Sequence, residues 1–307
     1  MHLEIVKHRN KFFIFSGILV LVSLLGLFIW KLKPGIDFKG GSFLEVAVTS
    51  QNKIEAQDLS VKIQEQMPDI GEVRVQPTEV GFILRTKSLS EEEHQKVLSS
   101  LKEIHSLGTE DSVIVEEKRF ESVGPMVGKE LKNKSVWALI LASLAIILYI
   151  AWSFRKISKP VASWKYGMGA VIALLHDLII VTGVFAILGH FLNYEIDLLF
   201  ITALLTILGF SVHDTIVVYD RTRENLIRNP QKTFEETVNK AINETLHRSI
   251  STSLTVFMVL LALYLLGGDS TKNFVLALLI GVVFGTYSSI FIASTLLIVW
   301  QKIGKKK

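Results

Sequence analysis

The chain has 307 residues and a net charge of +4 at neutral pH with histidine uncharged; 50% of the residues are hydrophobic and 20% are charged. A mean hydropathy of +0.42 excludes an ordinary soluble domain of this length and indicates a membrane protein. There are no cysteines, so we expect each folded part to depend on its own core and not on disulfides.

Apolar residues are concentrated in segments of about 17 to 25 residues, each long enough to cross a hydrocarbon core of ~30 Å as a helix. The predicted transmembrane helices are 12–30, 135–154, 166–188, 196–219, 250–266 and 274–298. Lys7, Arg9 and Lys11 precede the first segment, but no small-x-small cleavage site follows it. We therefore expect a retained helix and not a signal peptide.

Lysine and arginine cluster in the short segments next to these helices, which predicts their side of the membrane because basic loops stay in the cytoplasm. We expect the cytoplasm to hold the N-terminus (1–11), the loop 220–249 and the basic C-terminus (301–307). Helices two to six occupy 135–300, and the long segment 31–134 lies outside. That segment has a net charge of −3 and the rest +7, so the basic balance indicates topology and lipid headgroups and not nucleic acid.

The long segment alternates in pattern between strands and helices. Its predicted elements are strand 42–49, helix 54–67, strand 72–79, strand 82–89, helix 90–107 and strand 112–117. This order is that of a ferredoxin-like βαββαβ unit. The predicted fold is thus a polytopic α-helical membrane protein with six transmembrane helices and an α+β ferredoxin-like external domain. The sequence has no phosphate loop, metal-ligand cluster or nucleophile triad, so we expect a non-enzyme without cofactor or metal.

Charged residues inside the predicted helices are candidate functional residues, because each costs at least ~2.5–3.5 kcal/mol near the bilayer centre. Asp177 lies midway along the third helix beside His176, and Asp214 lies in the fourth beside His213. Arg248 lies at the cytoplasmic end of the fifth. An aspartate that alternates between pairing with arginine and binding a proton is a workable relay. The alternatives are a static Asp214–Arg248 ion pair and a protonated, hydrogen-bonded packing role for Asp177.

Two further patterns concern packing. Gly281 and Gly285 form a G-x-x-x-G face in the sixth helix, which predicts close helix packing, with a hinge as the alternative. Residues 233–246 place Phe234, Val238, Ala241 and Ile242 on one face, which predicts an amphipathic helix along the cytoplasmic surface or docked on a partner.

Several motifs together resemble the SecF family of protein translocase subunits, which belongs with SecD to the RND-type transporters. They are PGIDFKGG (34–41), SVGPMVGKEL (122–131), ALLHD (173–177), GFSVHDTIVVYDR (209–221), ENL (224–226), TLHRS (245–249), LYLLGG (263–268) and GTYSSIF (285–291). The residues of the first two motifs that we take as family markers are Gly35, Asp37, Gly40, Gly41, Gly124 and Pro125.

The resemblance implies an accessory subunit of the Sec translocon in the bacterial cytoplasmic membrane. Such a subunit joins SecD, acts beside SecYEG, and uses the proton-motive force to help preproteins leave the channel. It also implies proton coupling at Asp214 and Arg248. His213 stands where the family pattern suggests asparagine, so the imidazole either joins the relay or replaces an amide hydrogen bond. Because the chain ends after six helices, we expect the separate SecF form, for which SecD is obligatory.

Two alternatives to this interpretation stay open. An RND-type exporter of small molecules or lipids usually has two external loops, whereas only one is expected here. A passive scaffold of the translocon would need no ion coupling. The sequence also leaves open whether the driving ion is H⁺ or Na⁺, because a carboxylate near hydroxyls suits either.

Overall fold

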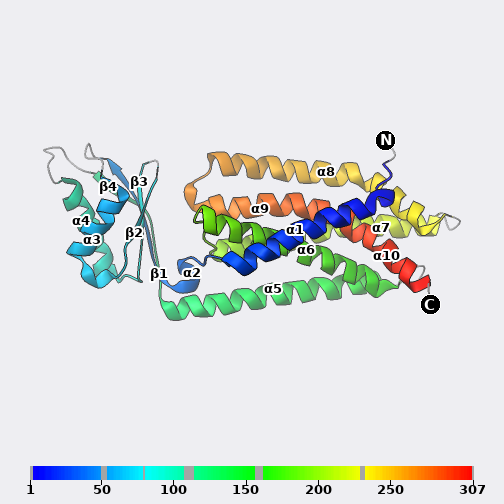
Figure 1. Cartoon of the computed structure of the whole chain (residues 1–307), viewed down its shortest axis with the longest axis horizontal. Coiled ribbons are helices and arrows are strands. Elements are labelled where there is room, and N and C mark those ends of the chain that lie inside the picture. The colour runs from blue at the N-terminus through cyan, green and yellow to red at the C-terminus, as the bar shows by residue number, and fades with distance from the viewer. Residues whose placement is uncertain are drawn as a thin grey trace. The chain divides into compact units, whose positions relative to one another are not determined.

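The computed structural model describes residues 3–49, 54–78, 80–106, 114–155, 162–228 and 232–305 (Figure 1). The chain divides into two compact units. One is Pro34–Lys134, and the other combines Met1–Lys33 with Ser135–Lys307.

The second of these units is helical. After the short turn η1 (Val6–His8), its helices are α1 (Arg9–Trp30), α5 (Pro125–Ser153), α6 (Ser163–Phe191), α7 (Leu198–Arg228), α8 (Phe234–Leu266) and α9 (Asp269–Tyr287), which continues through the π-helical segment η3 (Ser288–Ala293) into α10 (Ser294–Lys305). Six stretches within the described residues are long and apolar enough to cross a membrane. The predicted polytopic helical class is therefore confirmed. The start of α1 and the end of α10 lie at the same end of this unit (Figure 1).

Small residues allow the helices to approach closely. A Cβ added to Gly183 of α6 would lie 2.3 Å from Ser23 Cβ of α1. A Cβ on Gly281 of α9 would lie 2.3 Å from Ile207 of α7, and one on Gly285 would lie 3.1 Å from Ser211 Cβ. The predicted close-packing role of the G-x-x-x-G face is confirmed, because both glycines face α7; a side chain at Gly281 would clash with Ile207, and one at Gly285 would require Ser211 to shift by a few tenths of an ångström.

The helix predicted over 233–246 is present with its apolar face buried, but its predicted place along the cytoplasmic surface is wrong. This segment is the first part of α8, which runs without a break from Phe234 into the membrane-spanning part. Thr233 caps it, with Glu236 as the reciprocal partner in a capping box. Its apolar face, with Val238 and Ile242 fully buried, packs into the core of the helical unit and not onto a membrane surface.

Helix lengths also differ from the sequence prediction at two other places. α5 begins at Pro125 and not at 135, with proline at its first position, where a missing N–H costs nothing. α7 continues to Arg228, so the charged residues after Tyr219 are helical and exchange ion pairs along the helix. Arg228 lies 2.6 Å from Glu224, for example.

The unit Pro34–Lys134 contains a four-stranded antiparallel sheet. Its elements are α2 (Ile36–Lys39), β1 (Gly41–Thr49), α3 (Ala56–Gln66), η2 (Pro68–Ile70), β2 (Arg74–Pro77), β3 (Gly81–Thr86), α4 (Glu91–Ser106) and β4 (Ile114–Val123). The strands lie in the order β2-β3-β1-β4. β4 is longer than predicted because it pairs along all of β1, from Gly41↔Val123 to Thr49↔Ile114, with a bulge beside Glu45.

Ser90 and Glu93 cap the start of α4 reciprocally. Ser90 N donates to Glu93 at 2.8 Å, and Glu93 N donates to Ser90 Oγ at 3.3 Å. The hydrogen bond from the Ser90 backbone lowers the pKa of Glu93, and Lys87 at 3.4 Å acts in the same direction.

The core of this unit lies between the sheet and its two longer helices. Leu44 and Leu84 from the sheet, Ile63 from α3 and Leu101 from α4 are each at most 2% exposed. Burial of such aliphatic side chains is the main stabilising contribution, since the chain has no disulfides.

We expect Leu101→Ala to destabilise this unit by roughly 2–5 kcal/mol, because it removes buried methyl groups and leaves a cavity. The measurement is hydrogen exchange of β1 and α4 amides in the full chain, where protection should fall. Lys102→Ala, at the exposed neighbouring position, is the control and should leave protection unchanged. Equal protection in both variants would contradict this account of the core.

Candidate functional site

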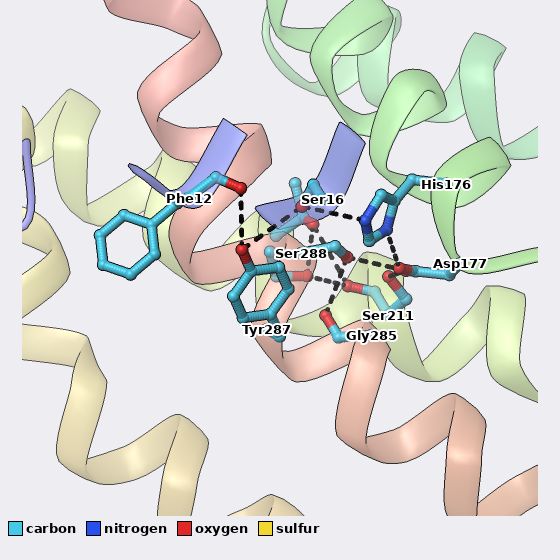
Figure 2. A network of polar contacts seen from close by, with 10 residues as sticks. Phe12, Ser16, His176, Asp177, Ser211, Gly285, Tyr287 and Ser288 are labelled. Carbon is cyan, nitrogen blue, oxygen red and sulfur yellow. Dashed lines mark hydrogen bonds and ion pairs between the residues drawn. The ribbon is translucent and has the colours of Figure 1, made fainter. Parts of the chain in front are cut away.

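Asp177 is the centre of a buried polar network inside the helical unit (Figure 2). Its side chain on α6 is fully buried. Ser211 of α7 and Ser288 of η3 donate hydrogen bonds to its Oδ2, at 2.6 and 2.8 Å. His176 Nδ1 lies 2.9 Å from Oδ1. Three hydrogen-bonding partners on one carboxylate compensate for the loss of water around an ionised group.

The network continues from His176 to α1. His176 Nε2 lies 3.1 Å from Ser16 Oγ, Ser16 donates to the Tyr287 hydroxyl at 3.3 Å, and that hydroxyl donates to the Phe12 carbonyl at 3.0 Å. Every donor has an acceptor when His176 carries both ring protons and Asp177 is ionised. The proton between His176 Nδ1 and Asp177 Oδ1 can belong to either atom. The total charge of the pair is zero in both arrangements.

Hydroxyl groups connect Asp177 to the region of α7 that carries Asp214. Ser289 Oγ donates to the Ser211 carbonyl at 2.8 Å, and Thr215 Oγ1 lies 2.8 Å from Ser289 Oγ. Thr215 is the residue after Asp214. The hydroxyl network thus reaches the sequence neighbour of Asp214, whereas the groups that act on the Asp214 side chain are His213 and residues of α8.

Asp214 differs from Asp177 in how its carboxylate is satisfied. It is only 3% exposed, and its Oδ2 has no hydrogen-bond partner in the part of the chain that the structure describes. Oδ1 lies 3.7 Å from His213 Nδ1, whose side chain is 61% exposed. Ser249 Oγ of α8 is likewise buried without a partner within 3.5 Å among the described residues, although this hydroxyl is close enough to act on the Asp214 carboxyl. A buried oxygen atom without a donor is unfavourable by about 1–3 kcal/mol, which binding of a proton relieves.

Arg248 lies on α8 beside a cavity of about 490 Å³. Acidic residues of α7 and α8 line the same cavity, but Glu244 is held by Arg221 at 2.6 Å and by Asn225 at 2.8 Å. Within the described ranges there is no ion pair shorter than 4.0 Å between Arg248 and Asp214. The structure therefore brings His213 and His176 to the two aspartates and leaves Arg248 on the neighbouring helix.

The family-marker residues meet inside the other unit. Gly40 has φ +80° and Gly41 has φ +132°, conformations that favour glycine. A Cβ on Gly40 would lie 2.9 Å from Pro125 Cα, and one on Gly41 would lie 2.7 Å from the Thr86 carbonyl. A Cβ on Gly128 would lie 3.2 Å from the Asp37 carbonyl. The two motifs thus pack α2 against the start of α5 through backbone contacts.

The remaining markers have different surroundings. Gly35 is the N-cap residue of α2, in an extended conformation. A Cβ on Gly124 would meet nothing within 4 Å, so packing does not explain this glycine. Among the described residues, no three His, Cys, Asp or Glu side chains form a group able to hold a metal ion.

Sequence reasoning missed Ser16, Tyr287 and Ser288 as members of the network. Ser16 and Ser288 lie in apolar segments, and nothing in their local pattern separates them from the other hydroxyl residues there. The signal that points to them is only that serine faces the interior of helix bundles more often than lipid.

The profile described as "Protein export membrane protein SecD/SecF, C-terminal" matches residues 104–303. Protein translocase subunit SecF of Thermobaculum terrenum is 44% identical over 97% of this chain and 94% of its own length. The chain belongs to the SecF family. The corresponding SecF proteins of Anaerolinea thermophila and of a Synechocystis species are 37% and 39% identical over 97% and 98% of this chain, and 94% and 95% of their own lengths. The resemblance predicted from the motifs is therefore confirmed.

SecF-family membership agrees with two solved structures. The crystal structure of SecDF from Thermus thermophilus, described as a translocon-associated membrane protein, matches with a TM-score of 0.79 and 29% identity, over 98% of this chain and 39% of that one. SecDF in a super-membrane-facing form matches with a TM-score of 0.69 and 31% identity, over 100% of this chain and 40% of that one. The chain thus spans about two fifths of the length of these SecDF chains.

Proposed function

We propose that this SecF-family chain is an accessory subunit of the Sec translocon that, together with SecD, uses the proton-motive force to promote preprotein export. The observation that carries the proposal is Asp214, a buried carboxylate in an apolar helix whose Oδ2 has no donor among the described residues. The names of its relatives, protein translocase subunit SecF, support the pathway.

Binding of a proton changes the charge of Asp214 and therefore the contacts that its carboxyl group needs. A protonated carboxyl group is neutral and needs one hydrogen-bond acceptor. An ionised one needs cations or water, because an isolated buried charge is strongly unfavourable. His213 Nδ1 lies 3.7 Å from the Asp214 carboxylate, and Arg248 lies on the neighbouring helix α8. Loss of the proton therefore draws Arg248 and α8 toward α7, and binding of a proton releases them.

Polar side chains exposed on α7 and α8 support a partner in the membrane. Thr202, Thr206 and His213 share one exposed face of α7, and Thr252 and Thr255 are exposed on α8. The hydroxyls of Thr202, Thr206 and Thr255 donate to carbonyls of their own helix, so the His213 ring is the strongest of these signals. Polar groups are unfavourable against lipid tails, and helix partners usually cover them. The length of the solved SecDF chains, more than twice the matched part, supports SecD as the polypeptide that covers this face.

The proposed topology places both termini in the cytoplasm and Pro34–Lys134 outside. The basic segments at the ends of the helices support this orientation. The strand order β2-β3-β1-β4, with helices between β1 and β2 and between β3 and β4, supports a ferredoxin-like module. We propose that this module contacts the emerging preprotein and that the complex acts beside SecYEG.

The test uses vesicles that contain the chain with SecD and SecYEG. An imposed proton gradient is expected to increase preprotein export, because it supplies the protons that Asp214 binds. A sodium gradient at constant pH is the control and should have no effect. Stimulation of export by the sodium gradient alone would contradict proton coupling. Export that neither gradient changes would favour a passive scaffold.

A further inference from the structure

The π-helical segment η3 (Ser288–Ala293) interrupts the last apolar helix inside the core. All of its residues except Phe291 are buried, and it contains no proline or glycine that would break the helix. A π turn contains one more residue than an α turn and its geometry is less favourable, so contacts outside the helix must stabilise it. Such turns occur frequently at functional sites.

Hydrogen bonds from other helices hold η3 along its length. At its start, Ser288 donates to Asp177 Oδ2 at 2.8 Å (Figure 2). In the middle, Ser289 donates to the Ser211 carbonyl at 2.8 Å. At its end, the Tyr219 hydroxyl donates to the Ala293 carbonyl at 3.1 Å. Only the first of these bonds ends on a group that gains and loses a proton.

Ser288 has two acceptors for a single hydroxyl hydrogen. Besides Asp177 Oδ2, its Oγ lies 3.2 Å from the Gly285 carbonyl, one turn earlier in its own helix. An ionised Asp177 accepts from both Ser211 and Ser288 at Oδ2. A proton on Oδ1, the oxygen that faces His176, leaves both serines in place. A proton on Oδ2 makes that oxygen a donor with room for only one incoming hydrogen bond, so one of the two serines then turns away. Ser288 is the one with another acceptor in place.

We propose that η3 is a proton-dependent register switch in which Ser288 is the positioning residue. Ionised Asp177 holds Ser288 and keeps the π turn, whereas protonated Asp177 releases it and lets the segment shorten to α-helical register. A shift of one residue turns α10 by about 100° and moves it by about 1.5 Å along its axis. The inference rests on the proposed proton coupling, and it names the element that proton binding moves.

The charged and titratable groups around Asp177 are few. On its own helix, His176 contacts the carboxylate, and on α9 Tyr287 reaches it through Ser16 and His176. On α7, Asp214 lies one turn beyond Ser211. The described part of α1 contributes only the uncharged Ser16 and Phe12 here. Among the described residues, His176 is thus the titratable side chain that contacts the Asp177 carboxylate directly.

Rotation of α10 has a mechanical consequence at its far end. Lys302 on α10 lies 2.6 Å from Glu235 on α8, the helix that carries Arg248. A turn of about 100° removes Lys302 from this pair. Proton binding at Asp177 is thereby communicated to α8, in addition to any direct effect of Asp214.

The test measures the position of α10 as a function of pH in the full chain. Because the chain has no cysteines, Met168→Cys on α6 and Gln301→Cys on α10 place two spin labels without further changes. In lipid nanodiscs, acidification is expected to shift the label-to-label distance from one population to a second. Ser288→Ala is expected to abolish the shift, and Ser288→Thr, which keeps a hydroxyl, to restore it. Asp177→Asn is expected to give one pH-independent distance.

Thr295→Val is the matched control. Its hydroxyl donates to the carbonyls of Phe291 and Ile292 in its own helix and does not contact Asp177, so the shift should persist. A shift retained in Ser288→Ala, or absent from the unsubstituted chain, would overturn the proposal. Because the measurement uses neither an ion gradient nor SecD nor preprotein, its result is independent of the export test, and failure of one leaves the other interpretable.

Discussion

Asp214→Asn is expected to remove the gradient-dependent part of preprotein export while leaving gradient-independent export at its normal level. Asparagine has nearly the shape of a protonated aspartate and cannot ionise, so it fixes the neutral state. The side chain is 3% exposed and sits in the membrane-spanning part of α7, so the substitution removes a buried charge and does not create a cavity. We therefore expect normal folding with the coupling lost.

The measurement is export into vesicles with and without an imposed proton gradient, at equal amounts of assembled complex. Asp220→Asn is the matched control, because this carboxylate lies on the same helix but its side chain is 67% exposed. It should retain full stimulation by the gradient. Equal stimulation in both variants would rule out Asp214 as the coupling group and support a passive scaffold.

A second substitution separates the two interpretations of His213. His213→Asn restores the amide that the family pattern suggests at this position. If the imidazole only replaces a hydrogen bond, gradient-dependent export should stay at the normal level. If His213 carries protons to Asp214, stimulation should fall, because the exposed ring lies 3.7 Å from the carboxylate and asparagine cannot titrate. The proposed direct role of Arg248 predicts the first outcome.

The membrane-spanning segments, and two aspartates inside them, could be located from the sequence alone. The reason is energetic. An apolar run of about 20 residues has few alternatives to a membrane helix, and a charge inside it stands out against that background. Gly40 and Gly41 are different, because the sequence marks them only through the family resemblance and their positive φ angles are a finding of the structure.

The sequence could not predict the partners of Asp177, because they depend on which face of each helix is turned inward. In a soluble protein the buried face is the apolar one, but here lipid and core are both apolar and the periodic signal is lost. Ser211 and Ser288, which donate to Asp177, and Ser16, which contacts His176, come from three segments far apart in the chain. The π segment has no local signal either, because it is maintained by bonds to Asp177 and Tyr219.

The continuity of α8 was missed for a related reason. Charged residues over 233–249 resemble a cytoplasmic segment, and the apolar stripe within it suggests attachment to the membrane surface. In the structure this stripe packs against the core of the helical unit of the same chain. Asn239 and Asn243 also bind the backbone of Leu3, at 3.0 and 2.9 Å, which ties the N-terminal segment to the same helix. Hydrophobic pattern alone does not distinguish a protein surface from a lipid surface.

Gly183→Leu is expected to prevent α1 from packing on α6 and to destabilise the helical unit by about 1–3 kcal/mol or more. A Cβ at this position would already lie 2.3 Å from Ser23 Cβ, and leucine adds three further carbon atoms. Because α1 carries Ser16, separation of the two helices also breaks the chain of hydrogen bonds from Phe12 to His176. The variant should therefore lose both thermal stability in detergent and the pH-dependent movement of α10.

Gly17→Leu is the matched control for this effect, because it places the same side chain on α1, where an added Cβ meets nothing within 4 Å. It should melt like the unsubstituted protein and keep the movement of α10. If both variants lost stability equally, insertion of leucine and not helix packing would be the cause. If Gly183→Leu lost stability but kept the movement, the Ser16–His176 contact would have no part in the switch, which would then depend on Asp177, Ser211 and Ser288 alone.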